Sequence, residues 1–272
     1  MSIHPTAIVD PSAQIAEDVE IGPFSVIGPN VKIASGCIID SGVKIDGYTE
    51  IGKNCKIYHG AVIGTPPQDV KFKPSEITYV KIGSGNLIRE FVTIHSATGA
   101  GNETVVGDNN FLMAYVHVGH NCHLGSNITI SNAASFAGHV HIEDNAVIGG
   151  MTGVHQFVRI GSFAMVGGCS RITKDVPPFS MIAGSPERFY GLNVVGLRRH
   201  GIDLETRNLI KRVYSIFCQK NRLDAIAEME KMDCSSKEMQ HILEFVKFDS
   251  KRGICFKRDS KVKKDKDTEV SF

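Results

Sequence analysis

The chain has 272 residues, and its 30 lysines and arginines nearly balance its 29 aspartates and glutamates. This balance argues against nucleic acid or an anionic membrane surface as a partner, and the lack of an apolar run of about 18 residues argues against a membrane span. Seven scattered cysteines with no C-x-x-C pair favour free thiols in a reducing cytoplasm over a disulfide framework.

An apolar residue recurs at every sixth position along most of the chain. The series runs from Ile3 to Ile63, restarts at Ile82, and continues through one weak position, Ala100, to Ile172. A helix of 3.6 residues per turn does not keep this register. A period of six is typical of a hexapeptide-repeat β-helix, in which three repeats make one coil of about 18 residues. Residues separated by one coil should then lie stacked about 4.8 Å apart.

Glycine often follows the periodic apolar residue, as at Gly22, Gly28 and Gly125. We interpret this offset as the corner of the coil, where a positive φ is needed and glycine adopts it without strain. The apolar side chains should stack as ladders in the interior, so that each coil is stabilised by its neighbours.

Two interruptions predict loops that leave the coil. The first covers about residues 65–80 and shifts the phase, because Ile63 and Ile82 are 19 residues apart. It contains Gln68, Asp69 and Lys71, which offer hydrogen-bond acceptors and a cation to a polar substrate. The second covers about residues 96–104 and preserves the phase. Loops on a rigid scaffold often carry function.

The repeat ends at Val176-Pro177-Pro178, which predicts a β-helix over residues 1–178. Apolar residues then follow a helical period, and Ser235 with Glu238 resembles a capping box. We expect a small helical domain over residues 179–256. The charged tail over residues 257–272 is predicted to be disordered.

Histidines are concentrated in the last third of the repeat. Positions 120, 138 and 156 should stack, so His139 and His155 fall within one residue of the column below His120. We expect these three imidazoles to meet on one edge of the coil. His123 and His141 should stack with each other elsewhere, where we expect solvated side chains.

Two kinds of chemistry fit such a column. Three histidines could bind zinc, or one histidine could act as a general base while the others bind a polar substrate. Gly138 favours the second possibility, because an accessible N–H beside the column could stabilise an oxyanion.

After the repeat, Asn193, Arg198 and Arg199 could hold a diphosphate, since arginine is a good phosphate ligand.

The chain resembles the UDP-N-acetylglucosamine 3-O-acyltransferases, which initiate lipid A synthesis, from about Ile3 to Ile254. The shared motifs are His117-Val118-Gly119-His120-Asn121-Cys122, Ala137-Gly138-His139, Ile148 to Phe157, Met165 to Ser170, Gln68 to Lys71, and Gly191-Leu192-Asn193 with Gly196-Leu197-Arg198-Arg199. The resemblance implies a left-handed parallel β-helix with a C-terminal helical domain, assembled as a homotrimer. It also implies transfer of an (R)-3-hydroxyacyl group from acyl carrier protein to the sugar 3-hydroxyl, with the carrier thioester as donor and no other cofactor or metal.

The resemblance also implies roles for individual residues. His120 matches the general base, and the Gly138 N–H matches the oxyanion donor. Gly168 matches the position that limits acyl length, where a missing side chain should admit a longer chain. The substrate cleft is implied at Gln68, Asp69, Lys71, His117, His139, His155 and Gln156, with nucleotide and phosphate contacts at Asn193 and Arg199.

Asn121 departs from the family pattern, because some members carry Asp after the catalytic histidine. An asparagine cannot supply the charge that stabilises an imidazolium, so a charged dyad is in question. Two alternatives remain open from the sequence: a zinc-dependent enzyme of the γ-type carbonic anhydrase kind, and the related N-acyltransferase of the same pathway. The latter normally has an additional N-terminal domain.

Overall fold

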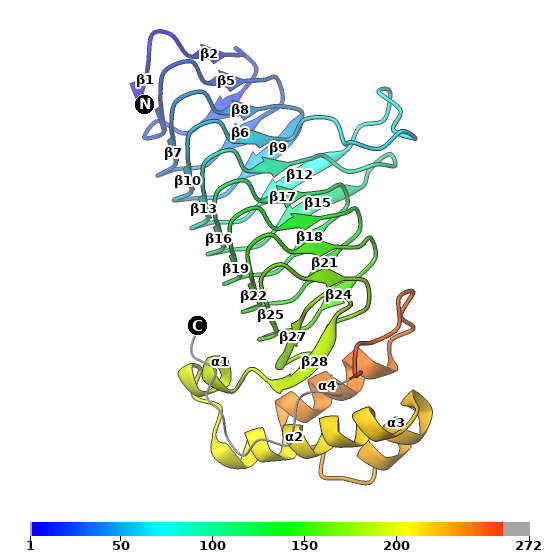
Figure 1. Ribbon diagram of the computed structural model, residues 1–272. Coiled ribbons are helices and arrows are strands. Elements are labelled where there is room, and N and C mark those ends of the chain that lie inside the picture. Colours follow the sequence, from blue (N-terminus) through cyan, green and yellow to red (C-terminus); the bar gives the residue numbers. More distant parts are fainter. Residues whose placement is uncertain (1, 258–272) are drawn as a thin grey trace.

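Figure 1 shows a computed structural model, in which the chain forms a long three-sided coil with helices packed at its C-terminal end. The structure describes residues 2–257. Residues 258–272 of the charged tail therefore lie outside the described residues.

The strands form three sheets, one on each side of the coil, which we call sheets A, B and C. Sheet A contains β1 (Ser2–Ile3), β4 (Glu20–Ile21), β7 (Ile38–Ile39), β10 (Lys56–Ile57), β13 (Leu87–Ile88), β16 (Phe111–Leu112), β19 (Thr129–Ile130), β22 (Val147–Ile148), β25 (Met165–Val166), β27 (Ser180–Ala183) and β28 (Arg188–Leu192). Sheet B contains β2 (Ile8–Val9), β5 (Val26–Ile27), β8 (Lys44–Ile45), β11 (Val62–Ile63), β14 (Thr93–Ile94), β17 (His117–Val118), β20 (Ser135–Phe136), β23 (Gly153–Val154) and β26 (Arg171–Ile172). Sheet C contains β3 (Gln14–Ile15), β6 (Lys32–Ile33), β9 (Tyr48–Ile51), β12 (Tyr79–Ile82), β15 (Glu103–Val106), β18 (His123–Leu124), β21 (His141–Ile142) and β24 (Arg159–Ile160).

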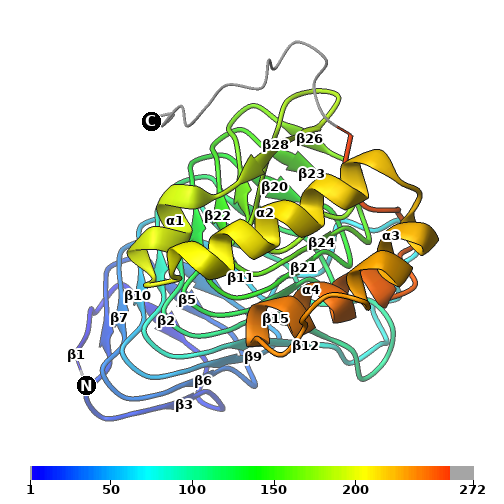
Figure 2. The same ribbon diagram turned by 90° about the horizontal axis from the view of Figure 1, so that it is seen from below.

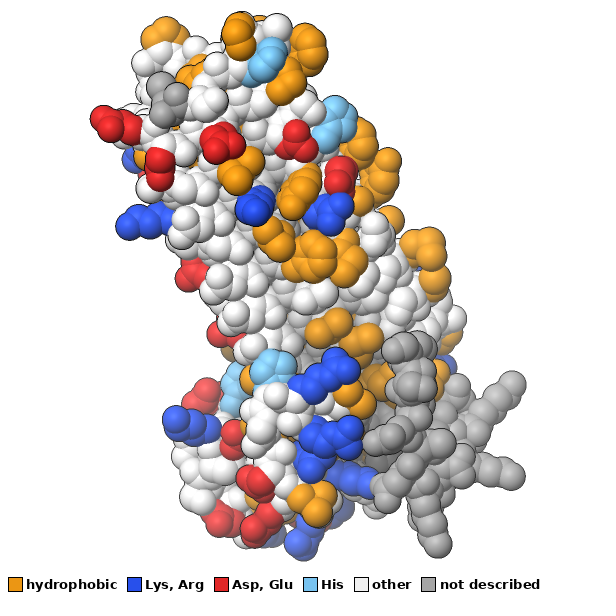
Figure 3. All heavy atoms as spheres, turned by 90° about the vertical axis from the view of Figure 1, so that its left-hand side faces the viewer, with side chains coloured by type: hydrophobic (Ala, Val, Ile, Leu, Met, Phe, Trp, Pro, Cys, Tyr) orange, Lys and Arg blue, Asp and Glu red, His pale blue; other side chains and the backbone are white. Residues whose placement is uncertain are grey.

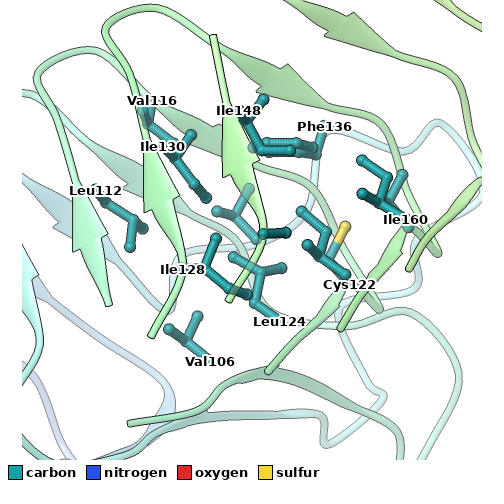
Figure 4. Packing of buried hydrophobic residues seen from close by; sticks show 14 of the residues in the cluster. Val106, Leu112, Val116, Cys122, Leu124, Ile128, Ile130, Phe136, Ile148 and Ile160 are labelled. Atoms are coloured by element: carbon teal, nitrogen blue, oxygen red, sulfur yellow. The ribbon is translucent and has the colours of Figure 1, made fainter. Parts of the chain in front are cut away.

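The periodic apolar residues form the core, as their spacing predicts. In sheet B, Ile27 pairs with Ile45, Ile45 with Ile63, and Ile63 with Ile94, and all four side chains are buried. Figure 4 shows part of this interior, where inward side chains from successive coils pack against one another. Burying an isoleucine contributes about 1.5–3 kcal/mol relative to leaving it exposed, so the ladders hold the coils together.

The expected role of the glycine after each apolar residue is wrong at most coils, with Gly64 (φ 79°) as an exception. The positive φ occurs at the third position after the apolar residue, as at Phe24 (φ 61°) and Asn30 (φ 61°). Gly22 serves a different purpose, because a Cβ there would lie 2.9 Å from the backbone of the next coil. Contact between coils therefore requires this glycine, while polar or aromatic residues accept the left-handed corner.

Both predicted loops leave the coil at the same edge. One lies between β11 and β12 and the other between β14 and β15, so each connects sheet B with sheet C. We call this edge the BC edge. The opposite side of sheet B, where the chain passes from sheet A to sheet B, is the AB edge. Figure 1 shows the longer loop, in cyan, extending sideways from the coil.

The helices follow later than residue 178, because β27 and β28 first extend sheet A as an antiparallel pair. The helices are α1 (Val194–Arg199), α2 (Leu204–Gln219), α3 (Arg222–Met229) and α4 (Lys237–Lys247), and Figure 2 shows them across the end of the coil. The capping residue of α4 is Ser236, which accepts a hydrogen bond from the N–H of Met239, and not Ser235 as predicted. None of the helices within residues 2–257 has the length and apolarity to cross a membrane.

A buried ion pair joins the helices to the coil. Arg159 Nε donates to Asp175 Oδ2 at 2.8 Å, and the two side chains are 16% and 1% exposed. The Arg159 guanidinium also lies 4.2 Å from the ring centres of both Phe245 and Phe248. Asp175 in turn forms a bridge with Ile254, so this contact fixes the C-terminal segment.

We predict that Arg159→Ala lowers the free energy of unfolding by about 3–5 kcal/mol, because it leaves the Asp175 carboxylate buried without its partner. Chemical denaturation measures this loss. Lys32→Ala is the control, since it removes an ion pair with Glu50 whose two side chains are about half exposed, and it should cost under about 1 kcal/mol. Equal losses from the two variants would contradict the structural importance of the buried pair.

Candidate functional site

Two of the three predicted imidazoles meet at the BC edge. The ring centres of His120 and His139 are 5.2 Å apart, with the rings nearly perpendicular. The next coil adds Phe157, which stacks on His139 at 4.6 Å. Lys251, from the segment after α4, lies 4.4 Å over the Phe157 ring.

We expected His155 to join this stack, but it does not. Its Nδ1 lies 3.2 Å from the carbonyl oxygen of Gln156, and within residues 2–257 no ring contact connects His155 with His120 or His139. The reason is the corner geometry, since His139 and Phe157 have positive φ and stack directly, whereas His155 precedes the corner. His123 and His141 stack with each other on sheet C, as predicted.

A second pair of histidines lies beside the first. The rings of His117 and His95 are 5.3 Å apart. His95 is buried and donates from Nδ1 to the Pro66 carbonyl oxygen at 2.7 Å, while His117 Nδ1 lies 2.8 Å from the Thr93 hydroxyl. Pro66 belongs to the first loop, so His95 connects this loop to the site.

Burial keeps two of these histidines uncharged at neutral pH. Burial, with the neighbouring His95 and His120, lowers the pKa of His117 to about 4. Burial, together with His120 and Lys251, also lowers the pKa of His139. A neutral imidazole can both donate and accept a hydrogen bond, which suits contacts with hydroxyl groups.

The first loop brings a carboxylate to His120. Asp69 Oδ1 accepts the backbone N–H of Lys71 at 2.9 Å. Its Oδ2 lies 3.9 Å from His120 Nε2, which is too long for a hydrogen bond but leaves both atoms facing the same space. The side chains of Gln68 and Lys71 are exposed on the same loop.

The second loop holds the residue that follows His120. Asn121 Oδ1 lies 2.8 Å from His120 Nδ1, and it also accepts the backbone N–H of Thr98 at 2.9 Å. The two loops touch each other, because the N–H of Gly99 donates to the Glu76 carboxylate at 3.0 Å.

Gly138 lies directly below the His120 ring. A Cβ at this position would lie 2.3 Å from His120 Nε2, so only glycine leaves room for the imidazole. Among the described residues, the N–H of Gly138 has no hydrogen-bond acceptor. It occupies the corner where the chain turns from sheet B to sheet C, and its N–H is therefore available to a ligand.

Three predicted site residues lie away from the histidines in a single chain. Gly168 lies at the AB edge, next to Gly150 on the preceding coil. Asn193 caps α1, with its Oδ1 accepting from Gly196 and its Nδ2 donating to Phe163, so both ends of its amide have partners. Arg199 is exposed in the last turn of α1. Gln156 is exposed beside His155.

The arrangement places an imidazole, a facing carboxylate and a free N–H within one corner. Within residues 2–257, no group of three or more His, Cys, Asp or Glu side chains is placed to hold a metal ion. The sequence reasoning missed Thr98 and did not assign His95. His95 follows Ile94 as Gly119 follows Val118 one coil later, so the six-residue register could have placed His95 on the same side of the coil as the segment that carries His120.

Comparison with family models supports both parts of the chain. Residues 103–138 match the bacterial transferase hexapeptide model of six repeats. Residues 175–255 match domain 2 of UDP-N-acetylglucosamine O-acyltransferase.

Known relatives match nearly the whole chain. Acyl-[acyl-carrier-protein]–UDP-N-acetylglucosamine O-acyltransferase of Thermodesulfovibrio yellowstonii is 50% identical over 256 residues, which cover 93% of this chain and 98% of the relative. The protein of the same name from Herminiimonas arsenicoxydans is 43% identical and covers the same shares. These names favour an O-acyltransferase over the zinc-dependent and N-acyltransferase alternatives.

Solved structures confirm the predicted fold class, a left-handed parallel β-helix followed by a small helical domain. LpxA from Acinetobacter baumannii has a TM-score of 0.89 at 39% identity, covering 93% of this chain and 99% of that one. The UDP-N-acetylglucosamine acyltransferase of Francisella novicida has a TM-score of 0.90 at 39% identity, covering 95% of each chain. The chain therefore belongs to the acyl-[acyl-carrier-protein]–UDP-N-acetylglucosamine O-acyltransferase family.

Proposed function

We propose that this chain transfers an (R)-3-hydroxyacyl group from acyl carrier protein to the 3-hydroxyl of UDP-N-acetylglucosamine, as the first step of lipid A biosynthesis. The similarity over 93% of the chain supports the reaction class and its two substrates. The observation that carries the assignment is local: His120 Nε2 and Asp69 Oδ2 face each other across 3.9 Å, beside the free N–H of Gly138.

In the proposed mechanism His120 is the general base. Its Nε2 accepts the proton of the sugar 3-hydroxyl while the oxygen attacks the carbonyl carbon of the carrier thioester. The new C–O bond forms, the C–S bond breaks, and the imidazolium returns the proton to the departing thiolate. The carbonyl oxygen becomes an oxyanion in this step, and the Gly138 N–H stabilises it.

The other residues of the edge bind the substrates. Neutral His117 and His139 exchange hydrogen bonds with hydroxyl or amide groups without introducing a second positive charge beside His120. Gln68, Asp69 and Lys71 contact the sugar and the acyl group from the first loop. His155 and Gln156, one coil below Gly138, extend the cleft towards the nucleotide.

We further propose that three copies assemble and that the cleft lies between neighbours. Large apolar side chains are exposed at the AB edge, including Phe24 (71%), Tyr115 (61%) and Met151 (68%), and Phe91 stacks on Tyr115 at 5.2 Å. Figure 3 views the molecule from the left-hand side of Figure 1, and it shows hydrophobic side chains gathered along the coil. Exposed apolar surface of this extent is typical of an interface.

Assembly would also bring the separated site residues together. The AB edge of one copy carries Gly168, the proposed limit on acyl length, and the BC edge of its neighbour carries His120. Arg199 and Asn193 would contact the nucleotide.

The carrier thioester already supplies an activated acyl group, so the proposed reaction uses no resident cofactor. The seven free thiols suit a reducing compartment, and we propose a cytoplasmic location.

His120→Ala should lower acyl transfer by roughly 10²–10⁴-fold without loss of the fold, because the hydroxyl then keeps its proton during attack. Mass spectrometry of products from UDP-N-acetylglucosamine and a mixture of 3-hydroxyacyl carriers measures both the rate and the preferred chain length. His123→Ala, at an exposed position of sheet C, is the control and should remain fully active. Full activity of His120→Ala would exclude this base.

Gly138→Ala should reduce kcat by about 10²-fold, since the new methyl group displaces the His120 ring and a displacement of about 1 Å is enough for such a loss. The matched control is Gly153→Ala, two strands from His117 on sheet B, where an added Cβ meets nothing within 4 Å. Steady-state kinetics and thermal unfolding of both variants provide the comparison. Wild-type kcat in a folded Gly138→Ala enzyme would contradict the proposed geometry.

Combined Phe91→Glu and Tyr115→Glu substitutions should convert the assembly to monomers, because they place charges in the proposed interface. Sedimentation velocity measures the mass of the particles. Leu223→Glu, at an exposed apolar position on α3, should leave the assembly intact. A wild-type protein that sediments as a monomer, or a double variant that remains trimeric, would refute the interface.

A further inference from the structure

We propose that Asn121 is a positioning residue that holds His120 in the one tautomer able to act as a base, and that the backbone of Thr98 holds Asn121 in turn. The inference rests on the proposed role of His120, and it explains how a neutral residue can serve at this position.

The orientation of the Asn121 amide is fixed by atoms whose hydrogen-bonding roles are known. The backbone N–H of Thr98 can only donate, and it lies 2.9 Å from Asn121 Oδ1. The carbonyl oxygen of Thr98 can only accept, and it lies 3.1 Å from Asn121 Nδ2. In a flipped amide, the NH₂ group would face the N–H of Thr98 and the amide oxygen would face the Thr98 carbonyl oxygen. Neither pair can form a hydrogen bond, so the observed orientation is the one that satisfies both contacts.

The amide orientation determines where the His120 proton resides. Asn121 Oδ1 is an acceptor and lies 2.8 Å from His120 Nδ1, so Nδ1 must carry the hydrogen. A neutral imidazole has one N–H and one lone pair, and the lone pair therefore remains on Nε2. Asp69 Oδ2 would favour a proton on Nε2, but at 3.9 Å it is beyond hydrogen-bond distance.

Asn121 is itself held by its surroundings. Its N–H donates to the Thr104 hydroxyl at 2.9 Å, and its backbone has a φ of 58°. The Thr98 hydroxyl also lies 3.0 Å from Asn121 Oδ1. Because Gly99 contacts Glu76, the conformation of both loops is connected to the tautomer of His120.

A neutral amide leaves the charge of the intermediate to another group. The titratable groups near the His120 ring include Asp69, His117 and His139. Once Nε2 accepts the substrate proton, the imidazolium faces the Asp69 carboxylate. The tautomer and the compensating charge are thus provided from opposite sides of the ring, by Asn121 and Asp69.

Nitrogen-15 NMR of the histidine rings in the full chain, without substrate, tests the inference directly. Wild-type enzyme should show His120 protonated at Nδ1 when neutral. Asn121→Gly keeps the positive φ accessible and should allow the Nε2-protonated form to appear. Its kcat should fall roughly tenfold, as expected from the loss of one hydrogen bond, while KM for UDP-N-acetylglucosamine stays unchanged. The matched control is Asn127→Gly, since Asn127 has the same φ of 58° at an exposed corner.

Asn121→Asp adds a readout that a purely structural role would not change. The carboxylate should keep the proton on Nδ1 and stabilise the imidazolium, so the acid limb of the kcat/KM profile should move to higher pH. An Nε2-protonated His120 in the wild type, or an unchanged tautomer in Asn121→Gly, would overturn the inference. These results are independent of turnover, so they differ from a failure of the proposed reaction, which would appear as absent acyl transfer by the wild type.

Discussion

The stacking of one inward side chain in every six residues is the constraint on which the rest of the molecule depends. Each strand pairs in register with the strand one coil away, and the ladder from Ile27 to Ile94 continues past the first loop without a break. A shift by one residue would exchange inward and outward side chains. Every outward residue therefore has a fixed height and a fixed side, which is why distant segments of the sequence can build one site.

The BC edge combines this rigidity with two connections that are free to vary. The coil sets His117, His120 and His139 at fixed positions, while the loops add Asp69 and Thr98 around them. Burial keeps His117 and His139 neutral, so neither opposes a positive charge on His120. On the opposite side, the Asp69 carboxylate lies 3.9 Å from His120 Nε2, where it would compensate a positive charge on the proposed base.

The sequence predicted those parts of the fold that follow from period alone. The positions of the strands, the exit of both loops and the contact between His120 and His139 all follow from coils of about 18 residues. The contacts of Thr98 and His95 depend on loop conformations that no period specifies. His155 was misplaced in the ring stack because it precedes the corner, where the chain changes direction. The capping role of Asn193 was not foreseen, because residue type alone does not distinguish a capping asparagine from a ligand-binding one.

The 19-residue spacing between Ile63 and Ile82 has a consequence for the site. A regular repeat would take six residues here, so 13 additional residues (19 − 6) lie in the chain between β11 and β12, and Ile82 still pairs with Ile51 on the coil before it. Lengthening such a connection costs little conformational entropy, whereas an insertion inside a strand would invert the pattern of every residue that pairs with it. A change of loop length at this one corner can therefore alter the surroundings of His120, while the coil keeps the imidazole at the same place.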